Sequence, residues 1–244
     1  MSDQESNAED RNLPASEKRI KDARAEGRVA RSKELASFLL LGAALCGLIG
    51  LGPTLFHDSL EIMSQGLQFD HAAVRSEANM GLRLVAFSGA ALIASIPILG
   101  LLLLAAVAAP LALSGWNFTW KPVMPDFNKL NPIAGIGRIF DKHGLIEMGK
   151  ASLIALALAT VAVTTLMNGR EEISQLANVP LVAGISKTGS MLVMSLAALV
   201  GVIAIAAMID VPAQLWRHHS SLKMTFEEVK RESRESDGDP NIKA

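Results

Sequence analysis

Four long apolar stretches separated by polar segments dominate the pattern of this chain. The stretches without a charged residue are Leu35–Phe56, Leu84–Trp120, Ala151–Gly169 and Thr188–Ile209. A helix needs about 20 apolar residues to cross the hydrocarbon core of a bilayer. The pattern therefore predicts an all-α integral membrane protein with four transmembrane helices, at residues 35–56, 84–109, 151–168 and 188–210.

The second apolar stretch is too long for a single span. Pro110 and the break at Gly115-Trp116-Asn117 indicate where the chain leaves the membrane, and Trp116 and Trp120 suit an interface. Pro97 is expected to kink this span or to free a backbone carbonyl.

Positive charges alternate between the segments that join the spans. Residues 1–34 carry eight Lys or Arg, loop 57–83 two, residues 110–150 five, loop 169–187 two and the tail 211–244 six. Because cytoplasmic segments are enriched in Lys and Arg, both termini and the middle loop are expected in the cytoplasm. The predicted organisation is a basic N-terminal segment (1–34), a membrane domain (35–210) with a cytoplasmic loop (110–150), and a cytoplasmic tail (211–244).

The segment Lys121–Lys150, here called the belt, is unlike an ordinary connector. Three of its first twelve residues are proline, yet it is rich in large apolar residues. Asn131-Pro132 is typical of a helix start, and Ile133, Ile136 and Phe140 follow at helical spacing. The belt is either an amphipathic helix that rests on the membrane or on its own spans, or a docking site for another protein.

The basic N-terminal segment predicts a short helix. Ser16 can cap a helix that runs to about Glu26, and Gly27 can end it. Two roles stay open: a solvated segment that sets membrane topology, or a helix on anionic lipid. Nucleic-acid binding is not expected, because acidic residues dilute the positive charge and no aromatic residues lie between the bases.

The tail predicts a charged helix over about Thr225–Ser236. Thr225 and Glu228 have the spacing of a capping box, in which each side chain binds the backbone amide of the other residue. The helix is polar on all sides, which favours a connector that projects into water over a packed element.

The spans are rich in small residues and contain no ionisable residue near the middle. Ala43 and Gly47 form a small-xxx-small pair, which permits close helix packing, either within the chain or with partner subunits. Asp210, at the end of the fourth span, is interpreted as a snorkelling or capping acid. Since transporters mark their pathways with buried ionisable groups, a small-molecule transporter subunit is the less favoured alternative.

Motifs for catalysis, metals and cofactors are lacking. The sequence contains no phosphate-binding glycine loop, no zinc-protease motif and no nucleophile with a nearby base. His218 and His219 point to different faces of a helix, so they are not expected to bind a metal. The single cysteine, Cys46, lies in an apolar span, where a thiol is usually inert. No cofactor, metal or enzyme activity is expected.

Four stretches together resemble the FlhB/YscU family of type III secretion export-apparatus proteins. Three are Ser16–Leu35 (SEKRIKDARAEGRVARSKEL), Leu130–Phe140 (LNPIAGIGRIF) and Leu222–Pro240, which contains LKMT, EVK and GDP. The fourth, Gly66–His71 (GLQFDH), resembles the flagellar branch of the family rather than the injectisome branch.

The resemblance implies an inner-membrane subunit of the flagellar type III protein export gate, whose spans form two hairpins. In that family the loop between spans two and three wraps the base of the FliP–FliQ–FliR gate. The implied partners are FliP, FliQ, FliR, FlhA, exported flagellar proteins and the lipid bilayer, with a homologous injectisome export gate as the alternative. The belt residues predicted to make the contact are Phe127, Leu130, Asn131, Pro132, Ile133, Ile136, Arg138, Ile139 and Phe140.

The family continues into a cytoplasmic domain with a self-cleaving Asn-Pro-Thr-His segment. This sequence contains no such tetrapeptide, so no catalytic residue is carried over and only the membrane part is expected here. The tail is then a linker toward that domain, with predicted linker residues Thr225, Glu228, Gly238, Asp239 and Pro240.

Overall fold

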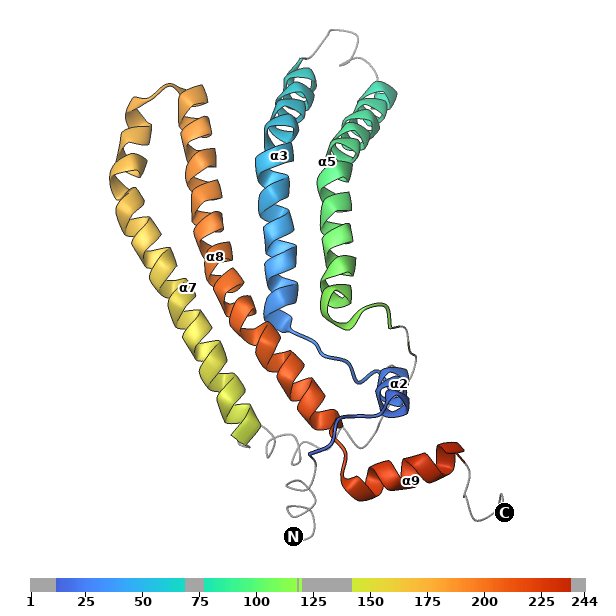
Figure 1. The fold of residues 1–244 in the computed structure, drawn as a ribbon. Coiled ribbons are helices and arrows are strands. Elements are labelled where there is room, and N and C mark those ends of the chain that lie inside the picture. Colours follow the sequence, from blue (N-terminus) through green and yellow to red (C-terminus); the bar gives the residue numbers. More distant parts are fainter. Residues whose placement is uncertain (1–11, 69–76, 118, 120–141, 238–244) are drawn as a thin grey trace, which may run out of the picture. The chain divides into compact units, whose positions relative to one another are not determined.

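The computed structural model describes residues 12–68, 77–117, 119 and 142–237. Its elements are α2 (Glu17–Ala25), α3 (Lys33–Leu67), α5 (Glu77–Ser114), α7 (Lys142–Gln175), the 3-10 helix η3 (Leu176–Asn178), α8 (Leu181–Leu222) and α9 (Phe226–Asp237) (Figure 1). Across these residues, extended backbone pairs only at a single antiparallel bridge between Leu13 and Met224. The predicted all-α class is confirmed.

Four helices are long and apolar enough to cross a membrane. They are Lys33–Leu67, Met80–Ser114 and Gly144–Asn178, of 35 residues each, and Leu181–Leu222, of 42 residues. A 35-residue helix is about 52 Å long, whereas the hydrocarbon core is about 30 Å thick. The helices extend beyond the charge-free stretches, because polar residues continue the helical ladder outside the hydrocarbon.

Helix α5 continues past the predicted span 84–109 and ends at the break predicted at Gly115-Trp116-Asn117. The helix passes through both Pro97 and Pro110 and ends at Ser114. Gly115 follows with a φ of 66°, and its N–H donates to the Leu111 carbonyl over 2.9 Å. Gly115 ends the helix because it adopts a left-handed conformation without steric cost, whereas a proline removes only one donor from the ladder.

The chain divides into two compact units. The first, here called the helix-pair unit, comprises Lys33–Pro110 and Ile139–Ala207. The second, here called the terminal unit, comprises Met1–Ser32, Leu111–Arg138 and Met208–Ala244.

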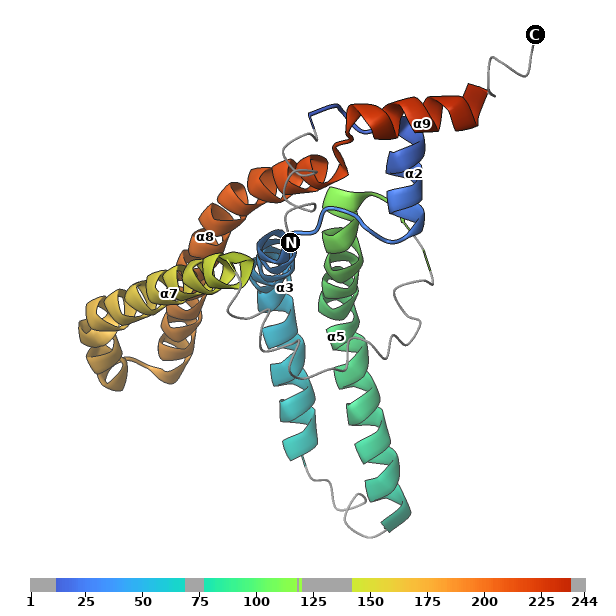
Figure 2. The ribbon, with the colours of Figure 1, turned by 90° about the horizontal axis from the view of Figure 1, so that it is seen from below.

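Within the helix-pair unit the long helices pack as pairs, α3 with α5 and α7 with α8 (Figures 1 and 2). A Cβ at Gly47 of α3 would lie 3.0 Å from Leu101 Cδ2 and 3.4 Å from Ile98 Cγ1, both on α5. A Cβ at Gly169 of α7 would lie 3.3 Å from Met191 Cε of α8. Glycine therefore permits close contact within each pair.

Other glycines of the same unit have no close neighbour among the described residues. A Cβ at Gly42, Gly50 or Gly201 would have no described atom within 4 Å. Large apolar side chains are also exposed, including Leu104 at 70% and Leu153 at 69%. Since water would not tolerate so much apolar surface, lipid or other subunits must cover these faces.

An ion pair connects the two helix pairs. Lys150 Nζ of α7 lies 2.7 Å from Glu34 Oε1, in the first turn of α3. Both side chains are largely buried, with 28% and 20% of their surface exposed. The contact ties the beginning of α3 to α7.

Candidate functional site

The predicted belt contacts cannot be placed. Phe127, Leu130, Asn131, Pro132, Ile133, Ile136, Arg138, Ile139 and Phe140 all lie outside the described residues. The same holds for the predicted linker residues Gly238, Asp239 and Pro240. The structure does describe Thr225 and Glu228. Both belong to a polar cluster in the terminal unit, which comprises Ser16, Arg19, Thr225, Glu228 and Glu232.

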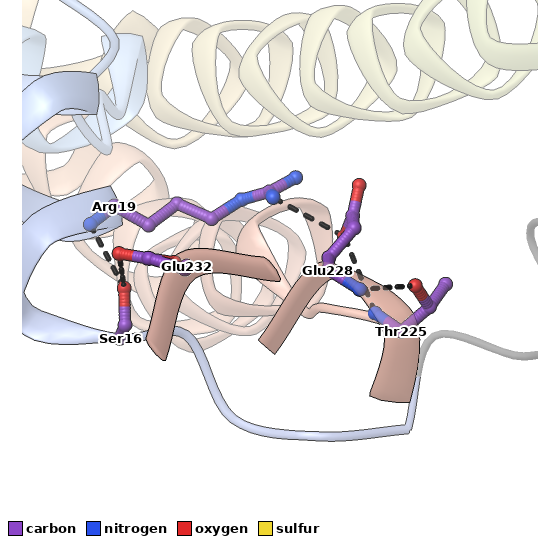
Figure 3. Close-up of polar contacts among 5 residues, drawn as sticks. All are labelled: Ser16, Arg19, Thr225, Glu228 and Glu232. Atoms are coloured by element: carbon purple, nitrogen blue, oxygen red, sulfur yellow. Dashed lines mark hydrogen bonds and ion pairs between the residues drawn. The ribbon is translucent and has the colours of Figure 1, made fainter. Parts of the chain in front are cut away.

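The beginning of α9 is a capping box, as the sequence predicted (Figure 3). The Thr225 N–H donates to Glu228 Oε2, and the Glu228 N–H donates to Thr225 Oγ1, each over 3.2 Å. Two backbone amides that would otherwise lack partners are thus satisfied by local side chains.

Helix α2 begins at the predicted cap as well. Ser16 Oγ accepts a hydrogen bond from the Arg19 N–H over 3.1 Å. Glu17 in the first turn and Arg24 in the last turn have the signs that favour the helix dipole. Gly27, with a φ of 77°, follows the end of the helix.

Helix α9 does not project freely, contrary to the prediction from its polar composition. Arg19 Nη1 donates to Glu228 Oε2 over 3.2 Å, and the Ser16 hydroxyl donates to the Glu232 carboxylate (Figure 3). Glu228, Val229 and Glu232 are half-buried on one face. The helix packs because its buried face is acidic and meets the basic helix α2.

The backbone before α9 is also attached to the N-terminal segment. The Leu13 N–H donates to the Met224 carbonyl over 3.1 Å, and the Met224 N–H donates to the Leu13 carbonyl over 3.0 Å. Met224 is only 2% exposed, and Ala23 of α2 is also buried. Apolar packing and backbone pairing thus reinforce the polar contacts.

The other end of α2 is held by residues that follow α5. Asn117 Nδ2 donates to the Arg24 carbonyl over 2.8 Å, and Thr119 Oγ1 donates to the Ala25 carbonyl over 2.9 Å. The last carbonyls of a helix have no partner within the helix, so these two side chains complete its C-terminal end.

Asp210 is buried rather than snorkelling. It is 3% exposed, and its Oδ2 accepts a hydrogen bond from Ser32 Oγ over 2.6 Å. Gln214 Nε2 lies 3.3 Å from Oδ1, and Arg217 Nη2 lies 3.9 Å from it. The interpretation as a snorkelling or capping acid is wrong, because Asp210 is buried and α8 continues beyond it to Leu222.

The histidines of α8 belong to no metal-ligand cluster among the described residues. The rings of His218 and His219 lie edge to face with centroids 6.1 Å apart. His219 Nδ1 lies 2.8 Å from the Leu215 carbonyl of its own helix.

Sequence reasoning missed the residues that join distant segments. No contact was predicted for four of these residues: Arg19, Glu232, Ser32 and Asn117. One signal was present: Glu228 and Glu232 are like charges four residues apart, an arrangement that is unfavourable on a free helix. Such a pair indicates a face that meets positive charge elsewhere.

Comparison with known proteins connects the chain to characterised relatives. The flagellar biosynthetic protein FlhB of Yersinia enterocolitica is 31% identical over 242 residues, which cover 97% of this chain and 63% of the relative. FlhB of Salmonella typhimurium is 32% identical over 229 residues, covering 92% and 59%. Yop proteins translocation protein U of Yersinia pestis is 28% identical over 236 residues, covering 93% and 64%.

This chain thus spans 59% to 64% of the length of these relatives. The sequence profile of the FlhB HrpN YscU SpaS Family matches residues 9–244. The match includes both helices of the polar cluster and all four apolar helices. The chain belongs to the FlhB HrpN YscU SpaS family.

Proposed function

We propose that this chain is a non-enzymatic subunit of the flagellar type III protein export gate in the bacterial inner membrane. It wraps and gates the cytoplasmic entrance of the export channel. The family membership, together with four helices able to cross a membrane, is the observation that carries this proposal. The flagellar assignment is supported by Gly66–His71 and by the names of two of the relatives.

The proposed partners are the gate subunits FliP, FliQ and FliR, with FlhA and exported flagellar proteins. Two features support a partner-rich membrane environment. The small faces at Gly42, Gly50 and Gly201 are open, and small residues permit close contact between membrane helices. The belt combines prolines with large apolar residues, which suits a contact with protein.

The proposed mechanism is mechanical. The belt clamps or releases the channel entrance, and α9 transmits the state of the cytoplasmic chain that follows it in longer relatives. We assign no self-cleaving role to any residue of this sequence, because it contains no Asn-Pro-Thr-His.

Co-purification tests the proposal. The chain is expressed with FliP, FliQ and FliR, with and without residues 121–150, and the intact complexes are weighed by native mass spectrometry. We expect the full chain to join at a fixed stoichiometry and the deletion variant to be lost. Failure of both forms to bind would overturn the gate assignment, and equal binding of both would overturn the belt as the contact.

A double substitution sharpens this prediction. Ile136→Asp with Phe140→Asp places two charges on the apolar face of the belt, so gate binding and motility should fall at least tenfold. Leu181→Asp with Val182→Asp is the matched control, since both residues are 79% exposed and lie at the beginning of α8, before the predicted span 188–210. Normal motility of the belt variant would contradict the proposal.

A homologous injectisome gate is the second candidate, favoured by the 28% identity to Yop proteins translocation protein U. Complementation separates the two. The flagellar proposal predicts that the gene restores motility to its own flagellar null strain, whereas restoration of injectisome secretion alone would favour the second candidate.

A further inference from the structure

Two segments more than 200 positions apart in the sequence dock side by side in the terminal unit. Ser16 and Glu232 are separated by 216 positions, and Arg19 and Glu228 by 209. Figure 3 shows that Arg19 and Ser16 reach from α2 toward the acidic face of α9. A segment needed only for its positive charge would not require such defined partners.

The groups that join the helices are the groups that cap them. Glu228 accepts from the Thr225 N–H within α9 and from Arg19 of α2. Ser16 accepts from the Arg19 N–H within α2 and donates to Glu232 of α9. The orientation of α9 is therefore coupled to the integrity of both helix ends.

Helix α2 is held at both of its ends. Its beginning is joined to α9, and its last carbonyls are bound by Asn117 and Thr119, which follow α5. The backbone bridge between Leu13 and Met224 adds a contact at the turn between α8 and α9. Helix α2 thus forms a strut between the exit of α5 and the start of α9.

We propose that the N-terminal segment Asn12–Ser32 is the positioning element of the tail helix, with Arg19 and Ser16 as its positioning residues. Their contacts fix the direction in which α9 leaves α8. Because one of these contacts is an ion pair, a change of charge or ionic strength weakens the attachment of α9. The effect of this weakening on export rests on the proposed function; the docking itself does not.

Spin-label distances test the docking in the full chain. Labels are placed at Ala25→Cys on α2 and Phe226→Cys on α9, in a Cys46→Ser background reconstituted in nanodiscs. Both labelled positions are exposed. We expect one narrow distance distribution at low salt and a broader one in concentrated NaCl.

Substitutions separate a specific contact from a general effect of charge. Arg19→Glu and Glu228→Gln should each broaden the distribution at least twofold; the Gln variant keeps an oxygen for the Thr225 N–H but loses its charge. Arg19→Lys should preserve the narrow distribution. Lys21→Glu is the matched control, because it makes the same charge change at an exposed position of α2. Equal effects of Arg19→Glu and Lys21→Glu would overturn the proposal.

Export is measured separately in the bacterium that carries the gene. Arg19→Glu should reduce secretion several-fold, while Lys21→Glu should not, and both should still co-purify with the gate subunits. A broadened distance with unchanged secretion would overturn the positioning role in export and leave the gate function intact. If even the unsubstituted chain fails to co-purify, the gate function is overturned, and the distance measurement alone decides the docking.

Discussion

The carboxyl group of Asp210 shows how a single buried acid is accommodated in an apolar helix. Burying a charge is costly unless hydrogen bonds replace its hydration. Ser32 supplies one such bond over 2.6 Å, and Gln214 and Arg217 lie near the other oxygen. Ser32, which precedes α3, is thereby joined to Asp210, which follows the fourth apolar stretch.

Ser32→Ala should therefore destabilise the chain by about 1.5–3 kcal/mol, because a buried carboxylate loses one of its donors. The double variant Ser32→Ala with Asp210→Leu should recover part of this loss, since both partners are then apolar. Unfolding in mixed micelles, followed by circular dichroism, gives these free energies.

Ser59→Ala is the control for the Ser32 substitution. The Ser59 hydroxyl is exposed and binds only the Leu55 carbonyl of its own helix among the contacts described, so its loss should cost about 0.5 kcal/mol or less. Equal effects of the two alanine substitutions would show that the Asp210 contact adds no stability.

At the scale of helices, the pairing of α3 with α5 depends on the close contact at Gly47. Side-chain atoms of Leu101 and Ile98 lie 3.0 and 3.4 Å from the position that a Cβ would take. Gly50, one turn further along α3, has no described neighbour within 4 Å of such a Cβ. The two glycines therefore differ in packing while sharing the same helix.

Gly47→Leu should weaken the pair by about 1–3 kcal/mol, as expected of overpacking. Gly50→Leu gives the same gain in helix propensity without this clash, so the difference between the two variants isolates the packing term. Unfolding of both variants in the same micelles measures it. A Gly47→Leu variant as stable as Gly50→Leu would contradict the close contact.

The helices were predictable from the sequence, but their docking was not. Charge-free stretches indicated the four long helices, and Ser16 and Thr225 marked the beginnings of α2 and α9. Of the two breaks predicted after the second span, Pro110 lies inside α5 and Gly115 follows its end, because composition does not distinguish a tolerated proline from a terminating glycine. The like charges of Glu228 and Glu232 were one local signal, but the partners Arg19 and Ser32 lie too far away in the sequence to be identified from a local pattern.

At the scale of the whole molecule, the alternation of Lys and Arg between segments predicts the membrane topology. Segments 1–34, 110–150 and 211–244 are rich in these residues, whereas loops 57–83 and 169–187 are poor. Both chain ends are then expected on the cytoplasmic side. The docking of α2 on α9 agrees with this expectation, because two segments in contact must share one side.

Cysteine labelling in intact cells tests this topology. In the Cys46→Ser background, Gln65→Cys and Asn178→Cys should react with a membrane-impermeant maleimide added outside. Both positions are exposed and lie in loops 57–83 and 169–187, which are poor in Lys and Arg. Ala25→Cys should react only after the inner membrane is permeabilised. The reverse pattern of labelling would invert the proposed orientation.

The double use of the Glu228 carboxylate has a consequence for cooperativity. The same oxygen closes the first turn of α9 and holds Arg19, so loss of one contact weakens the other. Short polar helices are marginal in water when isolated. Separation of α2 from α9 would therefore also unfold the first turn of α9. The tail would change from an ordered helix to a flexible segment in one cooperative step.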